Sequence, residues 1–145
     1  MAFFGVFSDK SEARARFEGR AHYLYAPVLH YSMDGRVALC HDAGRSLTEL
    51  LCTHPALFVA TAAGEQVSLG GATVAGFYKR YGKRFRRYLP APAAFAVYDA
   101  HKGALFLGGA KGEKCYLEEA DGALFFSSEP RLLRSPIPVD LALLK

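Results

Sequence analysis

The sequence lacks the features that mark several large protein classes. Its 145 residues contain no apolar run of the roughly 18–20 residues that a membrane-spanning helix needs. The stretch from Met1 to Phe7 has no basic start and is too short for a secretory signal. The 14 glycines show no collagen-like period, and 51% apolar against 22% charged residues is too apolar for a disordered chain. These absences predict one globular, soluble domain in the cytoplasm.

Cysteine is also scarce. The three cysteines, Cys40, Cys52 and Cys115, are far apart, and no Cys-x-x-Cys pair occurs. No combination of cysteines and histidines has the spacing of a zinc site. We therefore expect free, buried thiols in a reducing compartment and no metal site.

Positive charge is in mild excess, and it is concentrated in one segment. The net charge of +4 is too small to mark an obligate nucleic-acid binder. Six of the 18 cations lie within nine residues: Lys79, Arg80, Lys83, Arg84, Arg86 and Arg87. The aromatic residues between them recur at steps of three and four, so on a helix they share one stripe facing the core, while the cations face water. We interpret residues 78–88 first as a solvated basic face, second as a docking surface for a protein or peptide, and third as a nucleic-acid site.

Short apolar runs separated by turn residues predict a domain rich in β-strands. The expected strands cover residues 3–7, 37–40, 56–61, 94–98, 104–107, 114–117 and 123–127. An extended segment is expected over residues 21–29, and the Asp34-Gly35 pair predicts a turn before the second strand.

Helices are expected in fewer places. Ser46 and Glu49 have the spacing of a capping box, which predicts a short helix over residues 46–51. The clearest helix begins at Thr73 and ends before Pro90, with a break at Gly82. A short helix is expected over 128–133, and residues 9–20 fit a loop or a helical turn. The last ten residues are predicted to form a linker and the first turn of another helix.

An ordered series of motifs fills the second half of the chain. They are Tyr81-Gly82-Lys83-Arg84-Phe85, Phe95-Ala96-Val97-Tyr98-Asp99, Leu105-Phe106-Leu107, Gly112 with Lys114, and Leu124-Phe125-Phe126-Ser127-Ser128-Glu129 with Leu132-Leu133. In this order, residues 73–144 resemble the glutaminase domain of the asparagine synthetase family, a class II, N-terminal nucleophile glutamine amidotransferase domain. The first half is similar more loosely, through Met1-Ala2-Phe3-Phe4-Gly5, Asp34-Gly35-Arg36-Val37-Ala38-Leu39 and Ala63-Gly64-Glu65.

The resemblance implies a fold and a division of the chain. The family folds as an α+β structure in which two facing, mainly antiparallel sheets lie between helices, the αββα sandwich of N-terminal nucleophile hydrolases. Residues 1–135 then form a degenerate glutaminase-like domain. Residues 136–145 form a linker and the start of a following helix or synthetase domain, since Pro138-Val139-Asp140 resembles the family's linker.

The residues that carry out catalysis in the resembled family are missing from this sequence. Its nucleophile, a cysteine exposed when the initiator methionine is removed, falls at Ala2, whose methyl group cannot attack a carbonyl. The asparagine that stabilises the oxyanion falls at Ala63, and losing such a donor costs roughly 2.7–4 kcal/mol of transition-state stabilisation. The carboxylate that holds the substrate ammonium falls within 108–110, where none occurs. Three residues match the family's glutamine site as a vestigial substrate pocket: Arg36, Gly64 and Glu65.

Two further motifs carry less weight. Residues 108–114 are rich in glycine and lysine but fail the phosphate-loop spacing, so a connection between strands is expected. His41, Asp42 and Ser46 can be drawn as a hydrolytic triad, but neighbours in sequence seldom form one.

We therefore predict a non-catalytic, glutaminase-like domain. The resemblance extends to the N-terminal domains of lasso-peptide macrolactam synthetases and β-lactam synthetases, which use an internal amine and need no ammonia from glutamine. It implies no cofactor in this chain, ATP and Mg²⁺ only in an associated synthetase domain or subunit, and a precursor peptide as a further partner. The alternatives are a stand-alone peptide- or protein-binding module that uses residues 78–88, and an active amidohydrolase.

Overall fold

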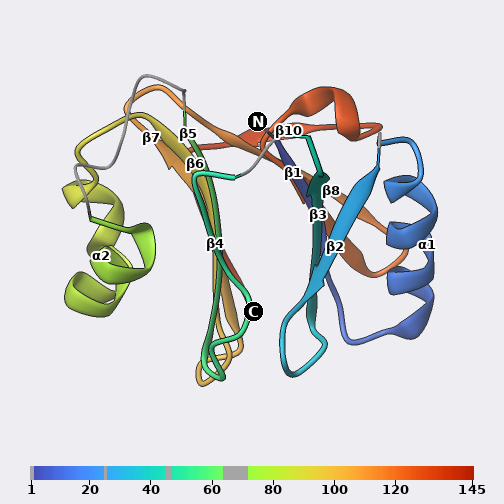
Figure 1. Cartoon of the computed structure of the whole chain (residues 1–145), viewed down its shortest axis with the longest axis horizontal. Coiled ribbons are helices and arrows are strands. Elements are labelled where there is room, and N and C mark those ends of the chain that lie inside the picture. Colours follow the sequence, from blue (N-terminus) through green and yellow to red (C-terminus); the bar gives the residue numbers. More distant parts are fainter. Residues whose placement is uncertain (1, 25, 45–46, 64–71) are drawn as a thin grey trace.

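Two antiparallel sheets face each other, with a helical layer outside each (Figure 1). The computed structural model of the chain describes residues 2–24, 26–44, 47–63 and 72–145. The first sheet, sheet A, has the strand order β10-β8-β9-β1-β3-β2, and sheet B has the order β11-β7-β6-β5-β4. The expected α+β, αββα sandwich is confirmed.

The elements are short and evenly divided between the sheets. Sheet A contains β1 (Phe3–Phe7), β2 (Pro27–Tyr31), β3 (Val37–Asp42), β8 (Cys115–Ala120), β9 (Ala123–Ser127) and β10 (Ile137–Val139). Sheet B contains β4 (Glu49–Leu51), β5 (Leu57–Ala63), β6 (Ala93–Asp99), β7 (Ala104–Ala110) and β11 (Leu141–Leu144). The helices are α1 (Ser11–Ala21), α2 (Val74–Tyr81), and the 3₁₀ helices η1 (Gly82–Tyr88) and η2 (Pro130–Leu132). No helix among the described residues is long and apolar enough to cross a membrane.

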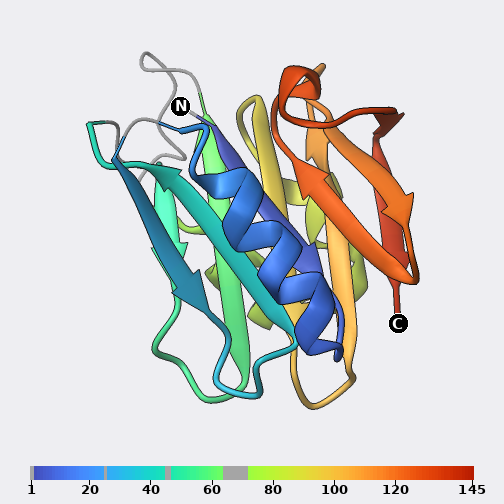
Figure 2. The same ribbon diagram turned by 90° about the vertical axis from the view of Figure 1, so that its right-hand side faces the viewer.

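The core follows from the two-residue period of the strands, which sends alternate side chains to opposite faces. Between the sheets, Phe3 and Leu39 of sheet A pack in one cluster with Phe58 and Leu107 of sheet B. Two outer clusters complete the core. One packs α1 against sheet A, and the other packs α2 and η1 against sheet B. Figure 2 shows α1 lying across the outer face of sheet A.

Helix α2 begins and ends where the sequence predicts. The Thr73 hydroxyl caps it by accepting from Gly76 N at 3.0 Å. The Glu49 carboxylate adds a second cap, accepting from Val74 N at 2.7 Å and from Ala75 N at 3.2 Å. Gly82 takes a φ of +61° and ends the α-helix, so the expected break there is confirmed.

Several expected elements are wrong. Residues 49–51 form strand β4 and not a helix, because this segment pairs with β5 and Glu49 caps α2 instead of its own helix; Ser46 lies outside the described residues. The extended segment expected over 21–29 begins only at Pro27. Residues 9–20 largely become α1.

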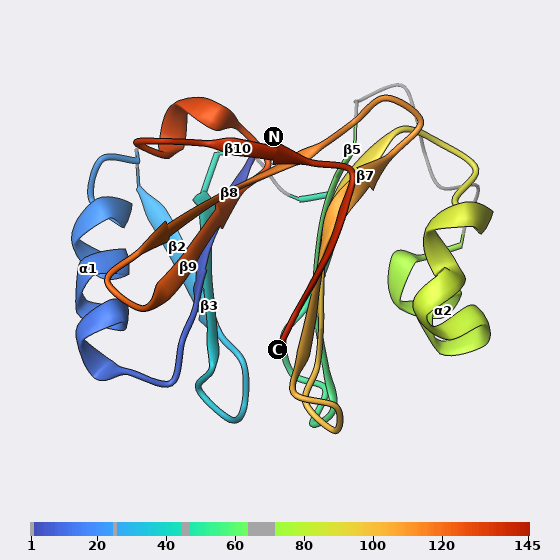
Figure 3. The same ribbon diagram turned by 180° about the vertical axis from the view of Figure 1, so that it is seen from behind.

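The chain end also differs from expectation. The predicted first turn of a helix is instead β10 and β11, which pair with β8 and β7. Both are edge strands, and Pro138, which has no N–H, is tolerated at such an edge. Figure 3 shows β10 lying along sheet A while the last residues run along sheet B. The domain division after residue 135 stays a prediction.

Two glycines in β7 lie at close backbone contacts, and Gly108 is the one that faces the crossing from β10 to β11. Gly109 N donates to Asp140 O at 3.0 Å, so the two backbones approach closely. A Cβ on Gly108 would overlap the Asp140 carbonyl oxygen, and one on Gly109 would overlap the Glu113 carbonyl. These glycines therefore belong to a strand at a close backbone contact, not to the connection that was expected.

We predict that Gly108→Ala lowers the free energy of unfolding by about 1–3 kcal/mol, because the added methyl must push the crossing apart. Gly19→Ala is the matched control. Gly19 lies in α1 with nothing near its Cβ position, so alanine there should raise stability by about 0.5–1 kcal/mol. Urea denaturation measures both changes. Equal effects of the two substitutions would contradict the close contact at Gly108.

Candidate functional site

Ala2 and Ala63, where the resemblance expects the nucleophile and the oxyanion donor, lie at the same end of the sandwich. Phe7 at the end of β1 packs against Tyr98 of β6, with 5.7 Å between ring centroids. Tyr98 pairs with Phe58 at the start of β5, so the end of β1 lies beside the start of β5. The start of β1 and the end of β5 are therefore together at the other end, where Figure 1 marks N. We call this the Ala2 end.

Hydroxyl groups at the Ala2 end hold the strand backbones. Ser127 Oγ donates to Phe3 O at 3.0 Å, and Phe3 N donates to Ser128 Oγ at 2.9 Å. The backbone amide of Ala63 donates to Thr48 Oγ1 at 2.9 Å.

The two buried thiols are poor nucleophiles. Cys40 and Cys115 have no exposed surface, and burial raises the pKa of each thiol to about 12. Cys115 Sγ lies 3.7 Å from Phe95 O, the distance of a weak hydrogen bond from the protonated thiol. The reactive form, the thiolate, is therefore scarce at neutral pH. All three cysteines are free, and Cys52 is the one that is partly exposed.

Arg36 lies at the opposite end from Ala2. Gly35 takes a φ of +76°, which closes the hairpin between β2 and β3 and places Arg36 just before β3. Its carbonyl accepts from Ser8 N at 2.9 Å, and its guanidinium lies 5.2 Å from the centre of the Phe7 ring. The structure thus does not bring Arg36 to Ala2 and Ala63. The other two residues of the predicted vestigial pocket, Gly64 and Glu65, lie outside the described residues.

A hydrogen bond ties the two sheets together at this opposite end. The Tyr98 hydroxyl on sheet B donates to Asp34 Oδ2 in the hairpin of sheet A at 2.5 Å. Burial alone would raise the pKa of the Asp34 carboxyl, but hydrogen bonds from Tyr98, from Arg36 N and from Ser32 lower it overall. This bond holds the hairpin that carries Arg36 against sheet B.

The basic segment forms an exposed surface on α2 and η1. We call it the α2–η1 basic surface, and it consists of Lys79, Arg80, Lys83, Arg84, Arg86 and Arg87. Five of these cations are exposed, and none of the six has a salt bridge within the part of the chain that the structure describes. Arg86 differs, because it is half-buried and its Nε donates to Gly109 O at 2.6 Å.

The aromatic stripe of this segment is only partly buried. Tyr78 and Phe85 are in the core, as expected. Tyr81 and Tyr88 instead stack on each other with 3.7 Å between ring centroids, and Tyr88 is 49% exposed. The expectation that every aromatic faces the core is wrong here, because Gly82 breaks the helical phase between the two tyrosines.

One polar pair was not predicted from the sequence. His30 on β2 and His41 on β3 lie with their Nε2 atoms 3.1 Å apart. His41 Nδ1 lies 3.0 Å from the Asp42 carbonyl oxygen. Because a carbonyl oxygen only accepts hydrogen bonds, Nδ1 of the neutral His41 ring is the donor, and its Nε2 therefore accepts from His30. Burial and the neighbouring His41 lower the pKa of His30. Within the described residues no three side chains of His, Cys, Asp or Glu gather around a possible metal position.

We predict that Cys40 and Cys115 resist alkylation in the folded protein at pH 8. Their thiols are buried away from the reagent, and burial raises the pKa of each thiol to about 12. Cys52 should react first with iodoacetamide, as followed by peptide mass spectrometry. The same protein unfolded in urea is the control, and it should react at all three sites. Labelling of Cys115 in the native protein at the unfolded rate would contradict this assignment.

Comparison of the sequence with protein-family models and with curated proteins gives no match. Solved structures do match. A glutamine phosphoribosylpyrophosphate (PRPP) amidotransferase from B. subtilis, in complex with ADP and GMP, superposes with a TM-score of 0.53 and 12% sequence identity. The match covers 91% of this chain but 42% of that one, so this chain spans less than half the length of the amidotransferase. At this identity the likeness concerns the fold alone: the chain shares the αββα sandwich found in that glutamine amidotransferase.

Proposed function

We propose that this chain is a non-catalytic, glutaminase-like domain of an ATP-dependent amide-bond-forming enzyme of the asparagine synthetase type. The observation that carries the proposal is the methyl group of Ala2 just before the start of β1, where the family that the sequence resembles carries its nucleophile. The amidotransferase-type fold supports the placement of Ala2, and the ordered motifs of residues 73–144 support the family.

The surrounding groups support the loss of chemistry. Acyl transfer from glutamine needs a nucleophile, a donor for the oxyanion and an anchor for the substrate. At the Ala2 end, Ala63 has a methyl group where the resembled family has its donor asparagine. Gly108 leaves room for the Asp140 backbone within the segment where the family has its substrate carboxylate. We infer that these positions serve packing in this chain.

The remaining role is to hold a partner. In this proposal ATP and Mg²⁺ belong to a synthetase domain or subunit, and this chain supports that unit or binds its substrate, as in lasso-peptide or β-lactam synthetases. A precursor peptide is the second partner class. The free cysteines fit a reducing compartment, so we place the assembly in the cytoplasm.

The α2–η1 basic surface favours a second candidate function, a peptide- or protein-binding module. Its five exposed cations keep their charge available to a partner, and the stacked pair of Tyr81 and Tyr88 adds exposed aromatic area. Clusters of arginine and tyrosine are typical of binding hot spots. This surface can serve the synthetase partnership or act alone.

We predict that the chain releases no ammonia from glutamine, because no nucleophile precedes β1. The test is a coupled ammonia assay on purified protein whose Met1 processing has been checked by intact mass. An amidotransferase with an N-terminal cysteine is the positive control. Turnover by the native chain above the blank would establish the third alternative, an active amidohydrolase, and refute the proposal.

Ala2→Cys separates the causes of inactivity. A cysteine restores the nucleophile but not the oxyanion donor at Ala63, so we expect this variant to stay at least about 100-fold below the positive control. Activity equal to the control would show that only the nucleophile is missing. That result would contradict the assignment of Ala63 as a lost donor.

We predict that charge reversal on the basic surface weakens association with an asparagine synthetase-type synthetase domain. The double variant Arg84→Glu with Arg87→Glu should reduce pull-down about tenfold or more, because like charges then face the docking site. Lys10→Glu is the matched control, since Lys10 is exposed at the start of α1 on the other side of the sandwich. Unchanged binding by the double variant would remove this surface from the interface.

A further inference from the structure

The α2–η1 basic surface has no acidic residues of its own to match its charge. The segment 72–98, which contains α2 and η1, has no Asp and no Glu. Among the described residues, the two carboxylates bonded to α2 are engaged there: Glu49 caps its first amides, and Asp99 Oδ2 accepts from the Tyr78 hydroxyl at 2.6 Å. Lys102 adds a further cation, with its Nζ 6.0 Å from the centre of the Tyr78 ring. A surface of one sign attracts an anionic partner.

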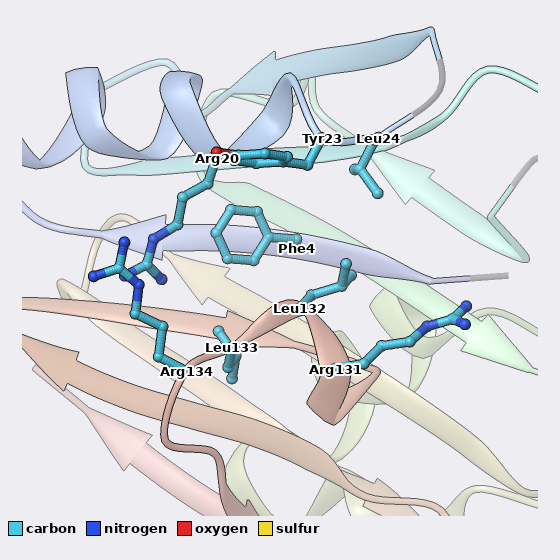
Figure 4. A pocket seen from close by; sticks show the side chains of 8 residues that line it. All are labelled: Phe4, Arg20, Tyr23, Leu24, Arg131, Leu132, Leu133 and Arg134. Atoms are coloured by element: carbon cyan, nitrogen blue, oxygen red, sulfur yellow. The ribbon is translucent and has the colours of Figure 1, made fainter.

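Arginines on the other side of the sandwich are different, because carboxylates pair with them. Arg20, Arg131 and Arg134 line a hollow between α1 and η2 (Figure 4). Glu118 pairs with Arg20 at 2.9 Å, and Glu129 pairs with Arg131 at 2.6 Å. Charge in that hollow is used within the fold, whereas the charge of the α2–η1 basic surface is open to a ligand.

A row of nearly parallel aromatic rings lies among the cations of the α2–η1 basic surface. The ring planes of Phe77 and Tyr81 differ by 19°, with 6.3 Å between centroids, and those of Tyr81 and Tyr88 differ by 7°, with 3.7 Å between centroids. The Arg80 guanidinium lies 5.3 Å from the centre of the Tyr81 ring. Phe77 and Tyr81 are partly buried against the core, so the row begins at the core and ends at the surface on Tyr88.

Tyr88 presents an open ring face to solvent. Tyr81 covers one of its faces, yet 49% of Tyr88 is exposed. A ring covered on both faces would not keep half of its surface exposed, so the second face of Tyr88 is open. The break at Gly82 causes this exposure, because it takes Tyr88 out of the helical stripe that faces the core.

An open aromatic face beside unpaired cations is the composition of a site for single-stranded nucleic acid. A single strand carries one phosphate and one planar base in each nucleotide, so both the cations and the ring face find a partner. An acidic peptide matches the cations alone, and a single phosphate ion matches one or two of them. The sequence ranks nucleic acid third for this segment because a regular helix would turn its aromatic residues to the core, and that reason does not apply to Tyr88.

We propose that the α2–η1 basic surface binds single-stranded nucleic acid, with phosphates at its exposed cations and one base stacked on Tyr88. The site uses no residue of the Ala2 end. Glutaminase activity would therefore leave this proposal intact, and failure to bind nucleic acid would leave the proposed glutaminase-like role intact.

The test is a fluorescence anisotropy titration of a labelled uridine decamer with the native chain. We expect saturable binding with a Kd of about 1–100 µM at roughly physiological salt, the range of sequence-independent contacts to phosphates. The matched probe is an abasic strand with the same label and the same number of phosphates. It should bind about fivefold more weakly or worse, because it has no base to stack.

Variants of Tyr88 test the stacked base. Tyr88→Leu should weaken binding of the uridine decamer about fivefold or more and leave binding of the abasic strand unchanged, which also shows that the surface remains folded. Tyr88→Phe keeps the ring face and should bind like the native chain. Tyr23→Leu is the control for an exposed tyrosine elsewhere, since Tyr23 follows α1 on the other side of the sandwich.

The salt dependence tests the phosphate contacts. The double variant Arg84→Gln with Arg87→Gln removes two exposed cations. Because each phosphate contact on a single strand contributes about 0.7 to the slope of log K against log salt concentration, the slope should become shallower by about 1.4. Lys10→Gln, at the start of α1, should leave the slope unchanged.

Three results would overturn the proposal. One is the absence of saturable binding of the uridine decamer at low salt. Another is equal binding of the uridine decamer by the native chain and Tyr88→Leu, which would show that no base stacks there. The third is binding of an end-blocked, labelled glutamate decamer at least as tight as that of the uridine decamer, which would assign the surface to an acidic protein segment.

Discussion

The architecture depends on the burial of β1 in the middle of sheet A. All five of its residues are buried, and the strand pairs with β3 on one side and β9 on the other. Phe3 and Phe7 face sheet B, whereas Phe4 and Val6 face α1, so this one strand joins two of the three core clusters. Because β1 cannot shift without breaking both, the residue before it has a fixed place at one end of the sandwich.

That fixed place matters for the proposed function, because the family that the sequence resembles carries its nucleophile at the residue before this strand, where this chain has Ala2. In the proposal, Ala2 and Ala63 stand in place of the nucleophile and the oxyanion donor. At the same end, Gly108 of β7 leaves room for the backbone of Asp140. The α2–η1 basic surface lies on the outer side of sheet B, where a partner can reach it.

Much of this fold could be predicted from the sequence because its signals are local. The strands of the meander show as short apolar runs, and Gly82 and Asp34-Gly35 are breakers whose effect needs no tertiary information. Elements fixed by pairing were missed. Residues 141–144 look helical by composition but become β11, because the open edge of β7 offers backbone partners.

The positions of site residues were also harder to predict from the sequence, because they depend on strand pairing and tertiary structure. Arg36 matched a family motif, but hairpin geometry takes it to the far end from Ala2. His30 and His41 meet only through the register of β2 and β3. Arg20 lines one hollow together with Arg131 and Arg134, which are more than a hundred positions away, and no sequence spacing indicates that they lie close together.

The central claim of the proposed function is that this chain does not attack a glutamine carbonyl, because Ala2 stands where the family that the sequence resembles carries its nucleophile. Its most direct test is covalent labelling with 6-diazo-5-oxo-L-norleucine, an electrophilic glutamine analogue, read by intact mass. An amidotransferase with an N-terminal cysteine confirms that the reagent is active. We expect the native chain to keep its unmodified mass. A stoichiometric adduct that peptide mapping places at the Ala2 end would contradict the claim, because it would reveal both a glutamine pocket and a nucleophile.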